Sequence, residues 1–468
     1  MRMLVPGLFA LSMLPQLGGC GASPLAERWP ERRPLGRAIE TYRPPREPDG
    51  RGEAKAVPLP EPNERVSLRK TLALALMHHP DLAAAGWEVR AAEARTLQAG
   101  LLPNPELGVE VEDFAGSGDS AGFDAVETTV SLSQLIELGG DREARIAVAR
   151  HGRDLSGWDY EARRVEILTE TAKRYLAVLA AQRRAELAEQ VEELVQQTAD
   201  TIDRRVEAGE ESSLERTRFR VQTATARLAR EQTERELAAA RQRLAAMWGD
   251  PEARFGELVG ELPEAEALPD LAELVAALEQ NPRLAMYASA IALRQAETDL
   301  AKARGVPDIT VGAGVRHFNE SDDVSFLVGA SVPLPLFDRN QGEALASRFE
   351  AARALAQQEA TRVRLHTQLV ERHQELILAY EQTTALRDEV LPAAREAFEG
   401  VQAAFDQGEI GLLDLLDAQR TLTESQSQYA DALSAYHQSL AAMEGLVGQP
   451  LADLDATSEQ PGTRQEQP

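Results

Sequence analysis

The chain contains one short sequence twice, and this repetition constrains the fold more than any other feature. Residues 405–417 read FDQGEIGLLDLLD, and a weaker copy at residues 206–218 reads VEAGEESSLERTR. Gly408 lies 199 residues after Gly209, at the matching position of the copy. Each copy lies between two long stretches with helical periodicity, and a glycine-centred turn between two helices produces an antiparallel helical hairpin. The sequence therefore predicts two such hairpins, with similar tips at about 206–215 and about 405–417.

The repetition extends well beyond the two tips. The stretch LALALMHHPDL is echoed by LVAALEQNPRL. Further matched positions are Pro80 and Pro282, Pro103 and Pro307, and Gly249 and Gly448. Their nearly constant spacing indicates a duplicated unit of roughly two hundred residues, far longer than the ~20–50 residues of solenoid repeats. We therefore expect two tandem units, residues 65–262 and residues 263–454.

Each unit is expected to contain two long helices. Residues 142–207 contain no proline, and their apolar residues recur at spacings of three and four, which is typical of an amphipathic helix with a narrow apolar seam. Return helices are expected at about 213–248 and 412–446, and the second long helix at about 343–405. Pro392 lies within the second long helix and is expected to break or kink it, because proline removes one helical hydrogen bond.

Before each long helix, the pattern changes from helical spacing to alternation of apolar with small or polar residues. The alternation covers about 105–134 in the first unit, as in Leu107, Val109 and Val111, and about 308–335 in the second. Strands of about ten residues match the ~9–11 residues of a tilted transmembrane β-strand. Four strands cannot close a membrane barrel alone, because their edges would stay unpaired in lipid, but several chains together could. Two soluble β-hairpins packed on helices are an equal alternative.

The N-terminus resembles a bacterial lipoprotein signal. Its apolar run is too short to span a bilayer as a helix but suits a secretory signal. The sequence Leu17-Gly18-Gly19-Cys20, which includes the only cysteine, is similar to a lipobox, in which the signal is cut before the cysteine and the cysteine is acylated. We predict a signal peptide at 1–19, an acylated Cys20 with a Pro-rich tether over 20–64, and a disordered tail at 455–468. Alternatively, the signal peptide is an ordinary one and Cys20 is incidental.

Composition limits the chemistry and the partners of the chain. Lys and Arg number 50 against 76 Asp and Glu, a net charge of −26, so we expect no nucleic-acid binding and a preference for cations in any conduit. Aromatic residues make up only 5 %, which favours long helices over a compact enzyme core. His78 and His79 are interpreted as a feature of a helix C-terminus rather than as a metal site. We expect no catalytic activity, no cofactor and no metal site.

Two carboxylates at the second tip are the most informative polar groups. Asp414 and Asp417 lie three residues apart at the start of an expected helix, and therefore on one face. Their simplest role is to complement the positive end of the helix dipole. If three chains surround an axis with these faces inward, six carboxylates form a narrow ring that attracts cations and binds di- or trivalent ions.

The two-unit organisation and several motifs resemble the outer-membrane factor family of TolC. GEIGLLDLLDAQRTL is similar to the second hairpin tip of that family, and LLPNPEL, SLSQLIELGGDR and VPLPLFDRNQG resemble its heavy-metal-efflux branch of CzcC- and CusC-like proteins. The resemblance covers about residues 66–454 and implies a mainly α fold with a small β part. It further implies a homotrimer whose twelve strands form one outer-membrane β-barrel, continued by a twelve-helix periplasmic α-barrel.

The resemblance also implies a function and a location. The family forms the exit duct of a tripartite efflux system, together with a periplasmic adaptor (membrane fusion protein) and an inner-membrane RND pump. The expected location is the outer membrane of a Gram-negative bacterium, lipid-anchored and extending into the periplasm, with heavy-metal cations as the exported substrate. Alternatives are a duct for organic drugs or secreted polypeptides and, in a different class, a coiled-coil lipoprotein scaffold without a pore.

By position, the resemblance assigns roles to the tip residues. Asp414 and Asp417 correspond to the two aspartates that ring the entrance. The adaptor-facing positions are Gly209, Ser213, Leu214, Gly408, Leu412 and Leu413. Where TolC itself has a gate-closing Tyr and Arg, this chain has Phe405 and Ile410, so closure must use other contacts. The candidates for these contacts are Arg205, Glu207, Glu215 and Asp406.

Overall fold

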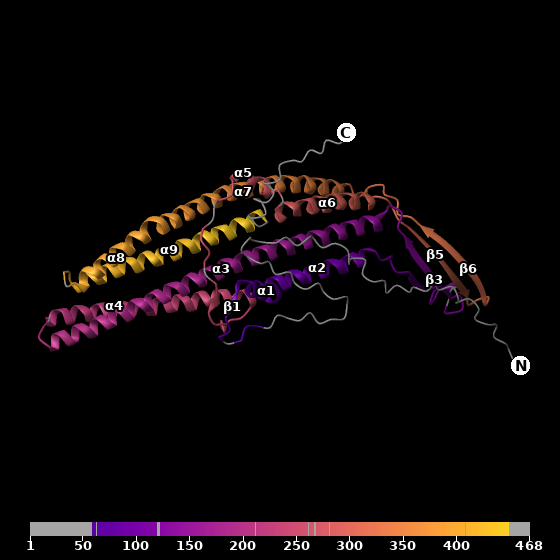
Figure 1. The fold of residues 1–468 in the computed structure, drawn as a ribbon. Coiled ribbons are helices and arrows are strands. Elements are labelled where there is room, and N and C mark those ends of the chain that lie inside the picture. Colours follow the sequence, from indigo (N-terminus) through magenta and orange to yellow (C-terminus); the bar gives the residue numbers. More distant parts are fainter. Residues whose placement is uncertain are drawn as a thin grey trace, which may run out of the picture.

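The computed structural model places the strands at one end of an elongated molecule and the turns of two helical hairpins at the other (Figure 1). It describes residues 59–61, 63–118, 122–210, 212–260, 262–265, 268–279, 281–407 and 409–448. The predicted signal peptide, Cys20, the tether up to residue 58 and the C-terminal tail lie outside these residues.

The first unit contains two helices, a β-hairpin, a long helix and a return helix. In chain order these are α1 (Leu68–His78), α2 (Pro80–Ala99), β2 (Glu106–Glu112), β3 (Glu127–Ile136), α3 (Asp141–Glu207) and α4 (Ser213–Ala245). A short 3-10 helix, η2 (Ala246–Trp248), follows α4. Two-residue strands, β1 (Val66–Ser67) and β4 (Leu258–Val259), pair in parallel, which local sequence patterns do not predict.

The second unit repeats this order. Its elements are α5 (Leu271–Leu278), α6 (Pro282–Ala303), β5 (Ile309–Phe318), β6 (Asp323–Ser331), α7 (Gln341–Ala385), η3 (Leu386–Val390), α8 (Leu391–Asp406) and α9 (Leu412–Val447). The same succession of elements therefore occurs twice, as the spacing of the matched prolines and glycines predicts.

Local sequence explains where the shorter helices begin. Ser67 caps α1, as its position suggests, and its Oγ accepts a hydrogen bond from the Lys70 amide. His79 and Asn281 cap α2 and α6 in the same way, each directly before a proline at the first helical position. His78 and His79 thus form the junction of two helices, which confirms their interpretation as helix-end residues.

The two long helices differ in one respect. α3 runs for 67 residues without a break, a length of about 100 Å at ~1.5 Å per residue. Its counterpart is divided, because the π-helical turn η3 separates α7 from α8. Pro392 is the second residue of α8, so the predicted interruption is confirmed, and its missing amide explains why the regular hydrogen-bond ladder cannot continue. Among the described residues, no helix is both long and apolar enough to cross a membrane.

Neighbouring elements follow one order along the whole molecule. The four-stranded antiparallel sheet has the order β2-β3-β5-β6. The helices next to the sheet pack in the order α2-α3-α6-α7, and those that lead to the hairpin tips pack in the order α4-α3-α9-α8. In each layer, the first unit provides one edge and the second unit provides the other.

Each unit has a hydrophobic core near the middle of the molecule. The first core lies between α1, α3 and η2 and includes Trp248, whose ring packs edge-on against Phe255 with 5.6 Å between centroids. The hydroxyl of Tyr175 donates a hydrogen bond to the carbonyl of Val259 in β4 and lies 3.3 Å from the carbonyl of Val66 in β1. Burial raises the pKa of Tyr175 to about 12. The second core joins α5, α7 and α9.

Candidate functional site

The four-stranded sheet has one apolar and one polar face, because the register aligns like side chains across the strands. Val109, Val130 and Val315, for example, lie in one row that ends at Phe326. The large apolar residues of this face are Leu107, Val109, Val111, Val130, Leu132, Ile136, Ile309, Val311, Val315, Val324, Phe326 and Val328, and Gln134 and His317 lie on the same face. Phe326 is 84 % exposed and Val328 is 89 % exposed. A contiguous apolar surface of this kind marks contact with lipid or with another protein.

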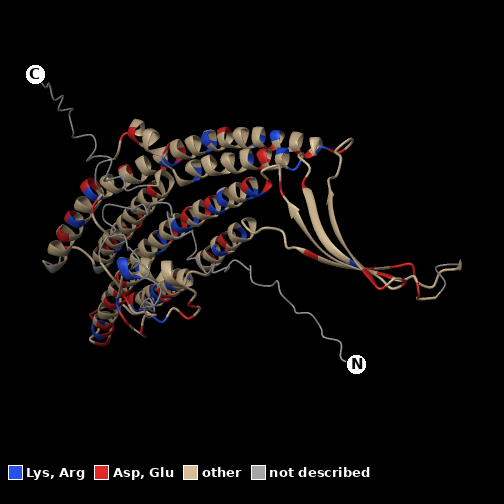
Figure 2. Ribbon diagram, turned by 90° about the vertical axis from the view of Figure 1, so that its right-hand side faces the viewer, with Lys and Arg blue, Asp and Glu red and all other residues tan. Residues whose placement is uncertain are grey.

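The sheet projects beyond the helices, and its strands carry charged residues mainly near their ends (Figure 2). None of the described helices packs extensively against it. Soluble hairpins packed on helices, the alternative that alternation alone leaves open, would instead have their apolar face covered. The arrangement therefore favours strands that lie in a membrane.

The polar face of the sheet is lined mainly by small and charged residues, and its large apolar members are Leu135, Phe318 and Leu327. The side chain of Arg316 in β5 reaches across β3 to β2, with ion pairs of 2.7 Å to Glu127 and 2.9 Å to Glu112, and its Nε donates to the Thr129 hydroxyl at 2.9 Å. The carboxylates on this face are Glu106, Glu110, Glu112, Glu127 and Asp323. Because a single arginine faces these five acidic residues, the polar face of the described sheet has a negative net charge.

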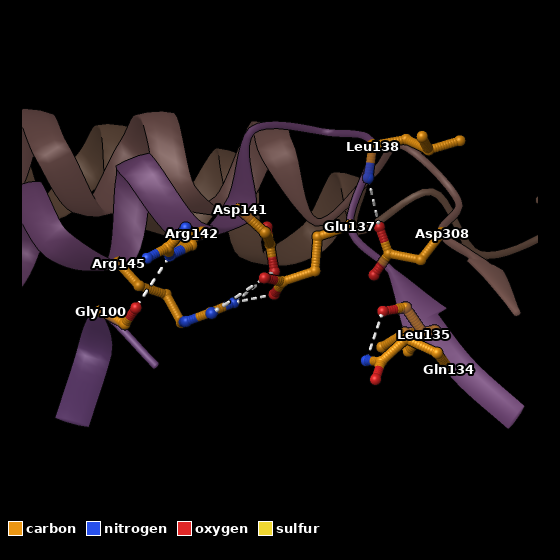
Figure 3. A network of polar contacts seen from close by, with 9 residues as sticks. All are labelled: Gly100, Gln134, Leu135, Glu137, Leu138, Asp141, Arg142, Arg145 and Asp308. Atoms are coloured by element: carbon orange, nitrogen blue, oxygen red, sulfur yellow. Dashed lines mark hydrogen bonds and ion pairs between the residues drawn. The ribbon is translucent and has the colours of Figure 1, made fainter. Parts of the chain in front are cut away.

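Polar contacts hold the sheet to the long helix that follows it (Figure 3). The amide of Leu138, just after β3, donates to Oδ1 of Asp308, just before β5, at 3.0 Å. Nε of Arg142 in α3 donates to the carbonyl of Gly100, after α2, at 2.8 Å. The first of these bonds joins the two units, and the second fixes the start of α3 against α2.

An ion-pair cluster completes this junction. Arg145 pairs with the largely buried carboxylate of Glu137, and its guanidinium lies 3.7 Å from the carboxylate of Asp141. Burial raises the pKa of Asp141, against the opposing effect of the nearby Arg304 guanidinium. The cluster therefore joins Glu137, the residue after β3, to the first turns of α3.

At the second hairpin tip, both predicted aspartates are exposed in the first turns of α9. Gly411 is the N-cap residue of α9, and its amide donates a hydrogen bond to the carboxylate of Asp414, the third residue of the helix, at 3.2 Å. Oδ1 of Asp417 accepts from Nη2 of Arg420 at 2.8 Å, within the same helix. In the described chain, no three His, Cys, Asp or Glu side chains converge to hold a metal ion, so a ring at this tip requires several copies of the chain.

The first tip has a similar construction. Gly209 adopts a φ of 76°, in the left-handed region that glycine favours. Ser212 caps α4, and its Oγ accepts from the Leu214 amide at 3.1 Å, whereas Ser213 is the first helical residue. Leu214 is 57 % exposed and Leu413, its counterpart in the second tip, is 40 % exposed. Both leucines are therefore accessible to a partner at the tips.

Within one copy of the chain, no ion pair between described side chains links the residues predicted to close the gate. Glu215 pairs with an arginine of its own helix at 2.8 Å. Arg205 and Glu207 are exposed at the end of α3, and no ion pair between described side chains connects Arg205 to Glu207 or Glu215. Among the predicted tip residues, Asp406 and Leu412 have side chains outside the described part, and Gly408 lies outside it altogether. The gate assignments therefore stay predictions.

A contact that helical periodicity does not identify joins the two tips. Leu416 of α9 is 7 % exposed and packs among Val195 and Ile202 of α3 and Phe219 and Ala226 of α4. The run LLDLLD contains four leucines, and spacing alone does not decide which of them faces the other hairpin.

This combination of a two-faced sheet and paired helical hairpins matches a known family. A sequence profile of the family "Outer membrane efflux protein" matches residues 71–250 and residues 274–449, once in each unit. The chain therefore belongs to the outer membrane efflux protein family, which confirms the resemblance to TolC-like proteins and the mainly α fold with two repeats.

Particular relatives lie in the heavy-metal branch of this family. The cobalt-zinc-cadmium resistance protein CzcC of Cupriavidus metallidurans is 32 % identical over 383 residues, which cover 82 % of this chain and 90 % of that protein. The nickel-cobalt-cadmium resistance protein NccC of Alcaligenes xylosoxydans xylosoxydans is 28 % identical over 295 residues, 63 % of this chain and 66 % of that protein. The crystal structure of CusC superimposes with a TM-score of 0.64 at 18 % identity, covering 86 % of this chain and 99 % of CusC.

Proposed function

We propose that three copies of the chain form the passive outer-membrane exit channel of an efflux system, and that heavy-metal cations pass through it. The main support for this proposal is that the sheet and the two helical layers have the same order of first-unit and second-unit elements. In the sheet and in both helical layers, a first-unit element lies at one edge and a second-unit element at the other. In the proposed assembly, the second-unit edge of one copy packs against the first-unit edge of the next, and a threefold rotation closes this head-to-tail contact into a ring.

The two free edges are complementary near the hairpin tips. α4 exposes Leu214, Val221 and Leu228, which are spaced seven residues apart. It carries eight arginines against four glutamates, whereas residues 386–406 carry two arginines against five acidic residues. An apolar stripe at heptad spacing between opposite charges is typical of neighbouring helices in a coiled coil. In the proposed ring, α4 of one copy packs against α8 of the next.

The sheet supports the same assembly. Three copies contribute twelve strands, and barrels larger than about eight strands leave an open lumen. The exposed apolar face, which includes Phe326 and Val328, would contact lipid, and the polar face around Arg316 would line the lumen. Each unpaired outer strand, β2 and β6, would then find a partner in a neighbouring copy.

The lining of such a channel favours cations. The polar sheet face is acidic, and the threefold arrangement would bring three copies of Asp414 and of Asp417 together at the other end of the channel. The names of CzcC and NccC specify cobalt, zinc, cadmium and nickel resistance. We extend heavy-metal export to this chain on the basis of that similarity and of the acidic lining. Export of organic drugs or polypeptides remains the alternative substrate class.

The tips are the proposed contact with the rest of the efflux system. A trimer presents six of them, and Leu214 and Leu413 are exposed there. We assign these tips to a periplasmic adaptor that connects the channel to an inner-membrane RND pump. Co-purification of the adaptor with the wild-type channel, but not with a channel that carries Leu214→Asp and Leu413→Asp, is the expected result. Equal recovery with both proteins would contradict this assignment.

Lipid anchoring through Cys20 is part of the proposal. Cells that express the full chain should incorporate labelled palmitate into the wild-type protein and not into the Cys20→Ala variant. Cys20→Ser serves as a second variant, because it retains the size of the side chain. Equal labelling of wild type and variants would show that the cysteine is incidental.

Channel activity is tested by reconstitution. Purified protein in a planar bilayer should produce cation-selective current, whereas a scaffold without a pore produces none. The substrate is tested in the host by deletion of the gene. We expect greater sensitivity to zinc, cobalt or cadmium and unchanged sensitivity to organic dyes. Unchanged metal tolerance with new dye sensitivity would assign the channel to the other substrate class.

A further inference from the structure

The carboxylates on the polar face of the sheet gather mainly at one end of it. This is the end at which both β-hairpins turn, away from the helices (Figure 1). The last row of side chains across the strands contains Glu112, Glu127 and Asp323, and the row before it contains Glu110 and Arg316. The next two rows toward the helices consist mainly of glycine and serine. In the proposed channel, the acidic end is the outer opening of the lumen.

Arg316 uses its whole guanidinium group at this end. Nη1 lies 2.7 Å from a carboxylate oxygen of Glu127, and Nη2 lies 2.9 Å from a carboxylate oxygen of Glu112. Nε donates a hydrogen bond to the Thr129 hydroxyl at 2.9 Å. Glu112 and Glu127 are directly opposite each other on neighbouring strands, so one planar cation binds two carboxylates that the register brings together. The four strands contain no other Lys or Arg.

Without this arginine, the two facing carboxylates would suit a divalent cation. Side chains directly opposite each other on antiparallel strands have Cβ atoms ~4.5–5.5 Å apart, and carboxylate oxygens are ligands for zinc and other divalent metals. A channel conducts an ion only if each binding site on its path is weak enough to let the ion leave. A free pair of glutamates at the outer opening would therefore slow the exit of the cations that the channel is proposed to export.

We propose that Arg316 is a specificity-determining residue of the channel, because it occupies Glu112 and Glu127 and so keeps the outer opening from retaining divalent cations. The inference rests on the proposed channel function. The ion pairs of Arg316 with described residues do not include Glu110 and Asp323, whose charges still attract cations to the opening. The structural alternative is a brace that only holds three strands together, which would affect stability but not the block of the channel by metal ions.

The test compares purified full-length variants in planar bilayers, in potassium chloride with increasing cobalt(II) chloride. Arg316→Gln should still conduct potassium, but cobalt should block it at a concentration at least about tenfold lower than in the wild type, because the charge of the ligands tunes the affinity of such sites over orders of magnitude. Arg339→Gln is the matched control. It removes the same charge outside the strands, where Arg339 donates a hydrogen bond to the Pro335 carbonyl, and should leave the block unchanged.

A second set of variants identifies the groups that bind the ion. In the Arg316→Gln background, Glu112→Gln with Glu127→Gln should restore the weak block of the wild type. Glu106→Gln lies on the same face but near the helices, and in this background it should leave the strong block in place. Equally strong block after removal of both Glu112 and Glu127 would overturn the inference.

Thermal unfolding of the detergent-solubilised variants separates the proposal from the structural alternative. An Arg316→Gln channel that is less stable than the wild type but is blocked at the same cobalt concentration would reduce Arg316 to a brace and overturn the proposal. If Arg316→Gln does not assemble, Arg316→Lys replaces it, because one ammonium group cannot bind both carboxylates as the fork does. Block of this lysine variant no stronger than that of the wild type would likewise overturn the proposal. A wild-type protein without any current would instead refute the channel function itself.

Discussion

The guanidinium of Arg184, in α3, pairs with the carboxylate of Asp431 in α9 and lies 4.0 Å from the carboxylate of Glu236 in α4. One side chain of the first unit thereby contacts both the return helix of its own unit and the return helix of the second unit. The contact contributes to the helix order α4-α3-α9-α8, on which the proposed ring depends.

Replacement of Arg184 by alanine should destabilise the junction between the two hairpins slightly. The pair is partly exposed, so we expect a loss of at most about 1 kcal/mol, and a smaller loss in high salt. Thermal unfolding of the detergent-solubilised protein, followed by circular dichroism at low and high salt, measures it. Arg183→Ala is the control, because Arg183 pairs with Glu186 of its own helix. A larger effect for Arg183→Ala would contradict the role given to Arg184.

The two faces of the sheet should tolerate charge differently. Phe326→Arg places a charge on the apolar face and should cost about 2–4 kcal/mol near the bilayer midplane. Ser325→Arg, at the adjacent position, places the same charge on the polar face and should be accepted. Outer-membrane fractions analysed for protein level and for oligomers measure the outcome. Normal assembly of both variants would argue against contact between the apolar face and lipid.

Neutralisation of Asp414 and Asp417 should weaken the block of the channel by cations and should leave the N-terminus of α9 intact. The side-chain carbonyl of an asparagine can still accept a hydrogen bond, so Asp414→Asn with Asp417→Asn removes charge while the Gly411 amide keeps an acceptor. We expect trivalent cations to block the channel at least about tenfold more weakly, because six carboxylates leave the entrance. Asp299→Asn, at an exposed site in α6, is the control. Unchanged block would remove these residues from the entrance.

Tyr175 should make the first core sensitive to alkaline pH. Its pKa is about 12 in the folded chain, against about 10 in an unfolded one. The neutral hydroxyl therefore contributes stability that is complete below pH ~10 and is lost as the pH rises toward ~12, because the unfolded chain loses its proton first. Tyr175→Phe should lack this part of the pH dependence and lose about 1–2 kcal/mol at neutral pH.

Urea unfolding of the wild type and of Tyr175→Phe at pH 8 and at pH 11 tests this prediction. Tyr287→Phe provides the control, since it removes a hydroxyl that contacts Thr361 outside this core. The same decline with pH in the wild type and in Tyr175→Phe would assign the sensitivity to other groups.

Much of the secondary structure could be predicted because its causes are local. The proline-free stretch predicted as a helix over 142–207 is α3, Asp141–Glu207. The interruption expected at Pro392 occurs in η3, which ends two residues before it. Strand alternation and helix caps depend on neighbouring residues in the same way, so the repeated order of elements and the membership of the family follow from the sequence alone.

The partners of these elements were decided only by the tertiary structure. Periodicity shows that a segment has an apolar side, but it does not say which distant segment covers that side. Three contacts join residues far apart in the chain. β1 pairs with β4, Arg316 reaches Glu112 and Glu127, and Leu416 packs among residues of the first hairpin. The common order of the three layers, which leads to the proposed ring, is likewise a property of packing between elements.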